Sequence, residues 1–253
     1  MTIFRNSVAF HVNEANQLEY IENISDSPVD VFIPSVISAG CKPGGRKAEI
    51  AIKILHPNLC RGLFKTITVS DQIGEISAFA FSNAKADTLV WPKSCKVIPF
   101  NCFADSSFCY LKNIEEVEKV EAFGFSNSNF SEINWPSKCS VIPSGCFRAS
   151  SVKSVTGIDN VTCVEESAFN KAEIKKIVWP SGCSIIPPLC FNECSLESIS
   201  NLNNVTEIQH SAFRDACNIE KIDLSKSIVS NISKSAFTGI DPSKIIFPYY
   251  LTP

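Results

Sequence analysis

The chain has 253 residues, a formal net charge of −3 and 45 % hydrophobic residues. That apolar content supports a continuous core and argues against disorder. The slightly acidic balance argues against a nucleic-acid-binding face, which needs clustered lysine and arginine. No apolar run approaches the roughly 18 residues of a membrane-spanning helix.

The first sixty residues carry no regular pattern. Residues 1–12 lack the sustained apolar stretch of a secretory signal peptide. The segment Val31–Ile33 before Pro34 predicts a strand, and residues 41–47, rich in glycine and lysine, predict a turn or loop insertion. We therefore predict that residues 1–60 form irregular N-terminal coils or a cap.

From residue 61 to 240 the chain repeats. A phenylalanine returns every 22 residues, and a small residue precedes each one. The set comprises Phe81, Phe103, Phe125, Phe147, Phe169, Phe191 and Phe213, and Phe237 follows 24 residues later. A fixed period in the low twenties is typical of a solenoid, whose coils must stack to bury their apolar faces. We expect one elongated body of regular 22-residue repeats.

Each coil predicts a short strand and a turn. The segment Leu89–Trp91 alternates with period two, as a strand does, and Pro92 ends it. Segments such as Ser167–Phe169 are long enough only for a helical turn, with serine as its cap. Residues 241–253 include Ile245–Phe247 and predict a C-terminal cap strand.

The tryptophans indicate that the structural unit is a pair of coils. Trp91, Trp135 and Trp179 are 44 residues apart, and Asn113, Gly157 and Asn201 take their place in the intervening coils. Close packing requires a smaller neighbour above and below each large ring. We expect a small strand displacement or bulge in the alternate coils.

The cysteines follow the same rule. Cys95 and Cys139 are 44 residues apart, two coils or roughly 9–10 Å, which exceeds the reach of a disulfide. The repeating cysteines alternate with small apolar residues and predict buried, reduced side chains. Together with the missing signal peptide, they favour an intracellular, reducing compartment. One pair, Cys194 and Cys217, lies close enough in the repeat to leave a disulfide open.

The segment from Phe130 through Ile133, Trp135-Pro136 and Ile142-Pro143 to Cys146-Phe147 resembles the leucine-rich repeat class, and its BspA-like subfamily most closely. The resemblance covers roughly residues 60–250; the chain departs from it in using Trp-Pro-x-x-Cys where the family has Ile-Pro-x-x-Val. It implies a mainly β fold of the α/β class. The expected fold is a right-handed solenoid with a parallel β-sheet on one face and short helical turns on the other. It also implies protein binding or adhesion, often on microbial or parasite surfaces.

The sequence predicts no enzyme. His11, His56 and His210 fall in coils that do not touch, and no phosphate-binding loop or nucleophile elbow occurs. We interpret the acidic stretch from Glu115 to Glu121 as a solvated edge rather than a metal site. Cys190 holds a core position, so we do not expect a zinc site with Cys194 and Cys217. No cofactor and no metal is therefore expected.

Alternate strand residues point outward and form the candidate binding face. We select Tyr110, Lys112, Glu132, Asn134 and Lys176, a mixed and weakly charged set suited to a protein partner. The predicted function is a non-enzymatic protein-interaction scaffold. Two alternatives are a cell-surface adhesin that binds host protein or glycan, and a repeat module that regulates a separate enzyme.

Overall fold

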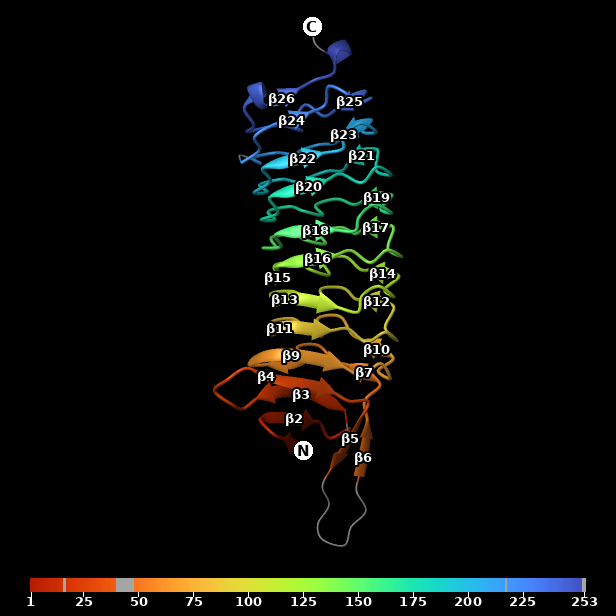
Figure 1. Ribbon diagram of the computed structural model, residues 1–253, viewed down its shortest axis with the longest axis vertical. Coiled ribbons are helices and arrows are strands. Elements are labelled where there is room, and N and C mark those ends of the chain that lie inside the picture. The colour runs from red at the N-terminus through yellow and green to blue at the C-terminus, as the bar shows by residue number, and fades with distance from the viewer. Residues whose placement is uncertain (16, 40–47, 217, 252–253) are drawn as a thin grey trace.

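The computed structural model describes residues 1–15, 17–39, 48–216 and 218–251. Figure 1 shows an elongated stack of coils, with the N-terminus at one end of the long axis and the C-terminus at the other. The 22-residue period explains this shape, because equivalent positions of successive coils become lateral neighbours. Leu89 accordingly pairs with Leu111 and Ile177 pairs with Ile199, each 22 residues apart.

A first column of parallel strands, the first strip, runs along the stack. It contains β4 (Val29–Ile33), β9 (Leu63–Val69), β11 (Lys85–Val90), β13 (Ser107–Lys112), β15 (Asn129–Phe130), β16 (Glu132–Asn134), β18 (Ser154–Thr156), β20 (Lys176–Val178), β22 (Ser198–Ser200), β24 (Ile222–Asp223) and β26 (Ile245–Ile246). The parallel sheet on one face is therefore confirmed.

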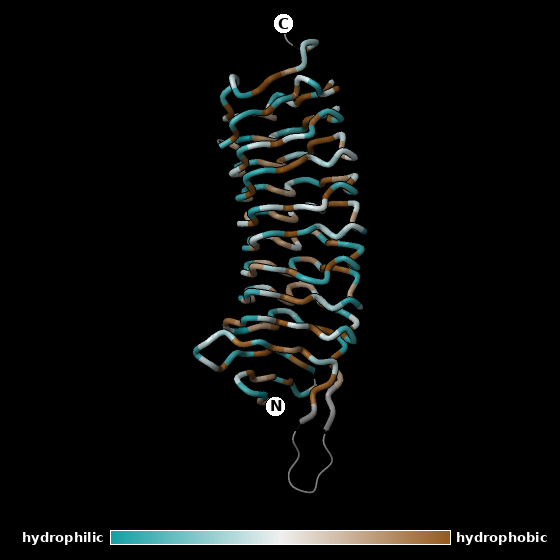
Figure 2. Tube along the Cα trace, viewed as in Figure 1, coloured by the Kyte–Doolittle hydropathy of each residue, from teal (hydrophilic) through white to brown (hydrophobic). Residues whose placement is uncertain are grey.

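A second column of two-residue strands, the second strip, was not predicted. It contains β7 (Ile54–Leu55), β10 (Glu75–Ile76), β12 (Val97–Ile98), β14 (Lys119–Val120), β17 (Val141–Ile142), β19 (Cys163–Val164), β21 (Ile185–Ile186), β23 (Glu207–Ile208) and β25 (Asn231–Ile232). From β7 to β21 each strand buries its second residue, such as Ile98 or Val120, and turns its first residue outward. Figure 2 shows the resulting alternation of hydrophobic and hydrophilic segments along each coil.

The prediction of short helical turns on the face opposite the parallel sheet is wrong. No α-helix occurs in the described residues; two 3₁₀ turns, η1 (Pro242–Lys244) and η2 (Tyr249–Leu251), lie at the C-terminal end. The residues two before and two after most core phenylalanines have left-handed φ angles, for example 58° at Phe123 and 51° at Asn127. A left-handed residue every few positions interrupts a right-handed helix. The N–H of Phe125 bonds instead to the carbonyl of Cys146 in the next coil.

The core phenylalanines form one continuous stack. The rings of Phe147 and Phe169 lie 5.3 Å apart between centroids at an interplanar angle of 6°. Comparable contacts run from Phe81 to Phe237. Offset ring stacking adds to the apolar area that each ring buries. The repeat thus predicted the core correctly.

The expected bulge in the alternate coils is replaced by a left-handed turn. Asn113, Gly157 and Asn201 have φ angles of 64°, 70° and 64°. Asparagine and glycine tolerate this conformation better than other residues do. At Gly157 an added Cβ would also lie 3.1 Å from the Trp135 carbonyl oxygen. Backbone conformation therefore favours these residue types, and packing further favours glycine at position 157.

The N-terminal end differs from the rest of the stack. The strands β1 (Thr2–Arg5), β2 (Val8–Val12) and β3 (Leu18–Asn23) form an antiparallel sheet, and β8 (Cys60–Arg61) joins it in parallel. The strands β5 (Val36–Ala39) and β6 (Ala48–Ala51) form a hairpin beside it. The loop predicted at 41–47 lies outside the described residues. The division into 1–60, 61–240 and 241–253 stays a prediction.

Candidate binding face

The first-strip face consists of the outward side chains of β9 to β22. Alternation along each strand buries Leu89 and Ile133, leaves the neighbours of Leu89 half-buried and exposes those of Ile133. Tyr110 is 56 % exposed, and the other four predicted residues are also exposed. They are Lys112, Glu132, Asn134 and Lys176.

The predicted residues fall into two rows along the stack. Tyr110 and Glu132 occupy one row in successive coils, and Lys112 and Asn134 occupy the next row in the same coils. Lys176 continues the first row two coils beyond Glu132, a separation of about 9.6 Å. The fold therefore places the first four residues together and Lys176 farther along the same face.

The face has few internal polar contacts. Thr156 Oγ1 donates to Glu132 Oε1 at 3.3 Å. Lys112 and Lys176 form no ion pair with any residue that the structure describes. Their ammonium groups therefore remain available to a ligand. The first-strip face can therefore contact the surface of a partner protein. Its five predicted residues do not form an activated nucleophile or a paired acid and base.

Two clefts at the carboxyl ends of the strands border the face. One has a volume of about 500 Å³, and Lys112, Asn134 and Asp159 help to line it. The second has a volume of about 480 Å³ and includes Asp159 and Lys176. The clefts were not predicted, although the replacement of tryptophan by Asn113 and Gly157 marks their positions in the sequence.

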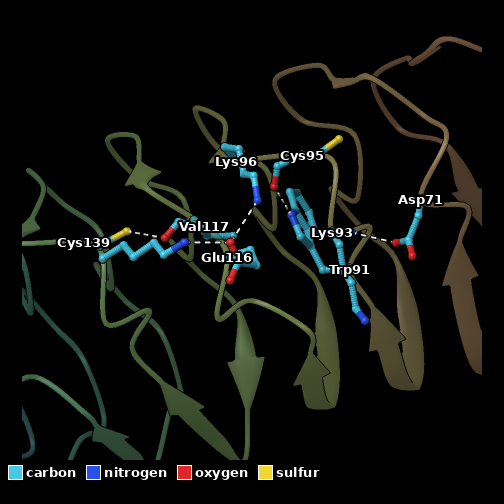
Figure 3. A network of polar contacts seen from close by, with 9 residues as sticks. Asp71, Trp91, Lys93, Cys95, Lys96, Glu116, Val117 and Cys139 are labelled. Carbon is cyan, nitrogen blue, oxygen red and sulfur yellow. Dashed lines mark hydrogen bonds and ion pairs between the residues drawn. The ribbon is translucent and has the colours of Figure 1, made fainter.

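The repeating cysteines are buried as predicted, but they are more than small apolar residues. The thiol Sγ of Cys139 donates to the Val117 carbonyl at 3.5 Å, and that of Cys95 donates to the Ile73 carbonyl at 3.3 Å. Figure 3 shows the Cys139 thiol directed at Val117. Burial raises the pKa of Cys139 to about 11, and the Glu118 carboxylate adds to the shift. These thiols therefore stay protonated donors near neutral pH.

The sequence leaves one disulfide open, between Cys194 and Cys217. Cys194 is a buried free thiol whose Sγ donates to the Ala172 carbonyl at 3.1 Å. Cys217 lies outside the described residues. Cys109 and Cys163, which are not among the repeating cysteines, are free and exposed.

The acidic stretch from Glu115 to Glu121 is a surface network. Glu116 Oε2 contacts Lys96 Nζ at 3.1 Å and Lys138 Nζ at 2.6 Å, linking three coils. The hydrogen bonds from Lys138 and Lys96 lower the pKa of Glu116. Figure 3 shows this bridge beside the Trp91 and Cys95 contact.

The described part of the chain contains no cluster of histidines and no group of side chains placed to bind a metal ion. His11 stacks on Tyr20 with ring centroids 4.0 Å apart, whereas His210 lines a distant surface depression. No three histidine, cysteine, aspartate or glutamate residues within the described ranges are grouped to hold a metal ion. Across those ranges, no helix has the length and apolar character needed to cross a bilayer.

Three solved structures are similar to this chain, and the likeness to the first supports the same fold. The pneumococcal vaccine antigen PcpA shares 15 % identity, with 95 % of this chain and 79 % of that chain covered and a TM-score of 0.50. A leucine rich cell surface protein from Faecalibacterium prausnitzii shares 15 % identity, covering 94 % and 86 % with a TM-score of 0.42. A leucine-rich repeat protein from Bacteroides ovatus shares 15 %, covering 96 % and 90 % with a TM-score of 0.41.

Comparison with curated proteins finds no match. The sequence model of the BspA type leucine rich repeat region matches in 6 copies over residues 74–196 and 162–252. These ranges contain all the stacked phenylalanines, from Phe81 to Phe237, and all three tryptophans. The chain belongs to the BspA-type leucine-rich repeat family.

Proposed function

We propose that the protein is a non-enzymatic interaction scaffold that binds a protein partner on its first-strip face. The main supporting observation is the exposed pair of rows around Tyr110 and Lys112, whose side chains make few contacts within the chain. From β9 to β22 the rows span roughly 30 Å. That length is sufficient for an interface of standard size, about 800 Å² on each partner.

The residue types at the centre of the face suit protein recognition. Tyr110 offers a large, rigid side chain at small entropic cost, as tyrosines in binding loops do. Lys112, Glu132 and Lys176 provide charges of both signs around it. Charges at the rim of an interface mainly set orientation and association rate. We place the site at these residues and Asn134.

In the experiment, three immobilised proteins are incubated with extracts of the native host, and the proteins that each one captures are compared. They are the wild type, the double variant Tyr110→Ala with Lys112→Ala, and the control Lys226→Ala with Ile228→Ala. The control also removes a lysine and an exposed apolar side chain two positions apart, since Ile228 is 61 % exposed. A partner of the face is lost only from the first variant, as measured by quantitative mass spectrometry. Equal capture by all three proteins would contradict the proposal.

The surface-adhesin alternative uses the same face. The words cell surface protein and vaccine antigen describe two structural neighbours, not this chain. The intracellular location favoured by the sequence stays a prediction. Labelling intact host cells with a membrane-impermeant reagent distinguishes the two, because only a surface protein becomes labelled.

A further inference from the structure

A separate groove lies on the second strip, away from the first-strip face. Its volume is about 520 Å³, and four successive coils line it, from Phe100 to Glu165. Val120, Val141 and Pro143 supply apolar lining between these ends. We call this feature the second-strip groove.

Phe100, the aromatic residue of the groove lining, is held in a ladder of three rings. Phe100 is 38 % exposed and packs edge to face between Phe79, at 5.7 Å, and Phe123, at 5.8 Å. Phe79 and Phe123 have φ angles of 61° and 58°, a region that bulky residues rarely adopt. The same φ recurs at this repeat position in other coils, for example at Asn101 and Leu189, so the repeat itself imposes the conformation that brings the rings together. The Phe100 ring is thus fixed in place and partly open to solvent.

Two carboxylates of the groove are held in fixed positions. Glu121 Oε2 accepts the Phe100 N–H at 3.0 Å, and Glu165 Oε2 accepts the Ser144 N–H at 2.8 Å. Glu121 and Glu165 are two coils apart, about 9.6 Å at strand spacing. Because backbone donors orient both groups, a ligand need not pay to order them.

The groove carries an excess of negative charge. Glu118 provides a third carboxylate, and the lining contains one ammonium, that of Lys119. Lys119 Nζ already pairs with Glu121 Oε1 at 3.0 Å. The complementary ligand is therefore cationic and also presents apolar surface to Phe100 and Val141.

We propose that the second-strip groove binds a cationic, proline-rich segment of a partner protein in the polyproline II conformation. Three residues of this helix advance about 9.3 Å, which matches the two-coil spacing of the carboxylates. Alternate residues of an extended strand advance only about 6.8 Å and fall out of register. Basic side chains at every third position of the partner segment form ion pairs with Glu121 and Glu165, and the intervening prolines pack on Phe100. Aromatic-lined grooves bind such helices because little entropy is lost on binding.

The test uses fluorescent peptides and anisotropy on the intact chain. The probe consists of Lys-Pro-Pro triplets, and two control peptides of equal length consist of Glu-Pro-Pro or Lys-Gly-Gly triplets. The wild type should bind the probe, with an affinity that falls as salt screens the exposed charges. The glycine peptide should bind more weakly, because it has the same charge but is not preordered.

Two matched variants locate the binding. Glu118→Gln with Glu165→Gln removes two groove charges and keeps an oxygen acceptor for Ser144, and it should weaken binding about tenfold. Glu173→Gln with Glu220→Gln changes net charge equally at exposed positions outside the groove, and it should leave affinity within about twofold. Thermal unfolding verifies that both variants fold. Absence of probe binding, equal affinity for the glycine peptide, or equal losses in the two variants would overturn the proposal.

Discussion

The indole Nε1 of Trp135 donates a hydrogen bond to the carbonyl oxygen of Cys139 at 3.0 Å. The same bond joins Trp91 to Cys95 and Trp179 to Cys183, each at 2.9 Å. The Trp-Pro-x-x-Cys segment is therefore closed by its own side chain. The cysteine thiol then contacts the preceding coil, as Cys139 does at Val117. This segment both shapes a coil and attaches it to its neighbour.

Replacing Trp135 by phenylalanine should destabilise the protein by about 1–3 kcal/mol, because it leaves the buried Cys139 carbonyl without this donor. The variant also loses part of the indole volume in a packed core. Chemical denaturation measures the change. Tyr110→Phe is the control, since this exposed side chain should contribute within about 0.5 kcal/mol. Equal stabilities for the two variants would show that the indole bond has no net effect.

Phe147→Ala should destabilise more than Phe237→Ala. Phe147 is fully buried between Phe125 and Phe169, so truncation leaves a cavity costing about 3–5 kcal/mol. Phe237 is only partly buried, at the C-terminal end of the stack, where the neighbouring chain can relax. Urea titration with a common slope compares the two. Equal losses of unfolding free energy would contradict the stacking account.

Gly145→Ala should cost about 1–3 kcal/mol. Gly145 has a φ angle of 59°, and an added Cβ would overlap the Phe123 ring. Gly74→Ala is the matched control, because the nearest atom to its Cβ would be the Lys53 carbonyl oxygen at 3.9 Å. Thermal unfolding should show a clear decrease for the first variant only. A normal melting temperature for Gly145→Ala would mean that the Phe123 ring moves aside without cost.

The double variant Tyr110→Ala with Lys112→Ala should unfold within about 0.5 kcal/mol of the wild type. Both side chains are exposed, and neither takes part in the buried phenylalanine stack. Circular dichroism during heating measures this difference. A larger loss would mean that these side chains stabilise the sheet, and any binding defect would then need a different explanation.

The period predicted the core because a constant 22-residue spacing directly identifies which side chains become lateral neighbours. It predicted Phe147 above Phe125 without knowledge of the path between them. Backbone conformation was harder to predict. Asn127 and Asp105, both left-handed, belong to residue types that tolerate this region, yet the Ser-Ala-Phe segments favoured a helical turn. The residue type two positions after each core phenylalanine was therefore the sequence signal that could have identified the left-handed conformation.

The second strip, its groove and the border clefts could be identified only from the three-dimensional structure. A strand as short as Val97–Ile98 shows no alternation that a sequence pattern can reveal. The groove beside it needs Phe100 and Glu165, which belong to coils three repeats apart. The first-strip face was selected from strand alternation, which extends over more residues in β11 and β13. Its two border clefts lie beside the left-handed turns at Asn113, Gly157 and Asn201, whose conformation the sequence pattern did not specify.

Cysteine labelling should separate exposed from buried thiols. Cys109 and Cys163 should react with an aromatic disulfide reagent in the native state, whereas the eight other free cysteines of the described residues are buried and should not. Replacing Cys41 and Cys217 by serine removes the two sites that the structure leaves undescribed. Denaturation should then expose all ten thiols. A lower total without reductant would reveal a disulfide among these ten, and the Cys194 and Cys217 pair is tested in the wild type, where denaturation should expose all 12 thiols.

The pH dependence of labelling distinguishes the two exposed sites from the core. Partial burial and the nearby Glu165 carboxylate raise the pKa of Cys163, so its labelling should accelerate as the pH rises above neutrality. The thiols of Cys139 and Cys183, with pKa values of about 11, should remain unreactive over the same range. Cys163→Ser should remove one of the two native-state labelling sites, and Cys109→Ser should leave the labelling of Cys163 and its rise with pH in place. Native-state reaction of Cys139 below its pKa would mean that the second strip opens locally, contrary to a uniformly packed stack.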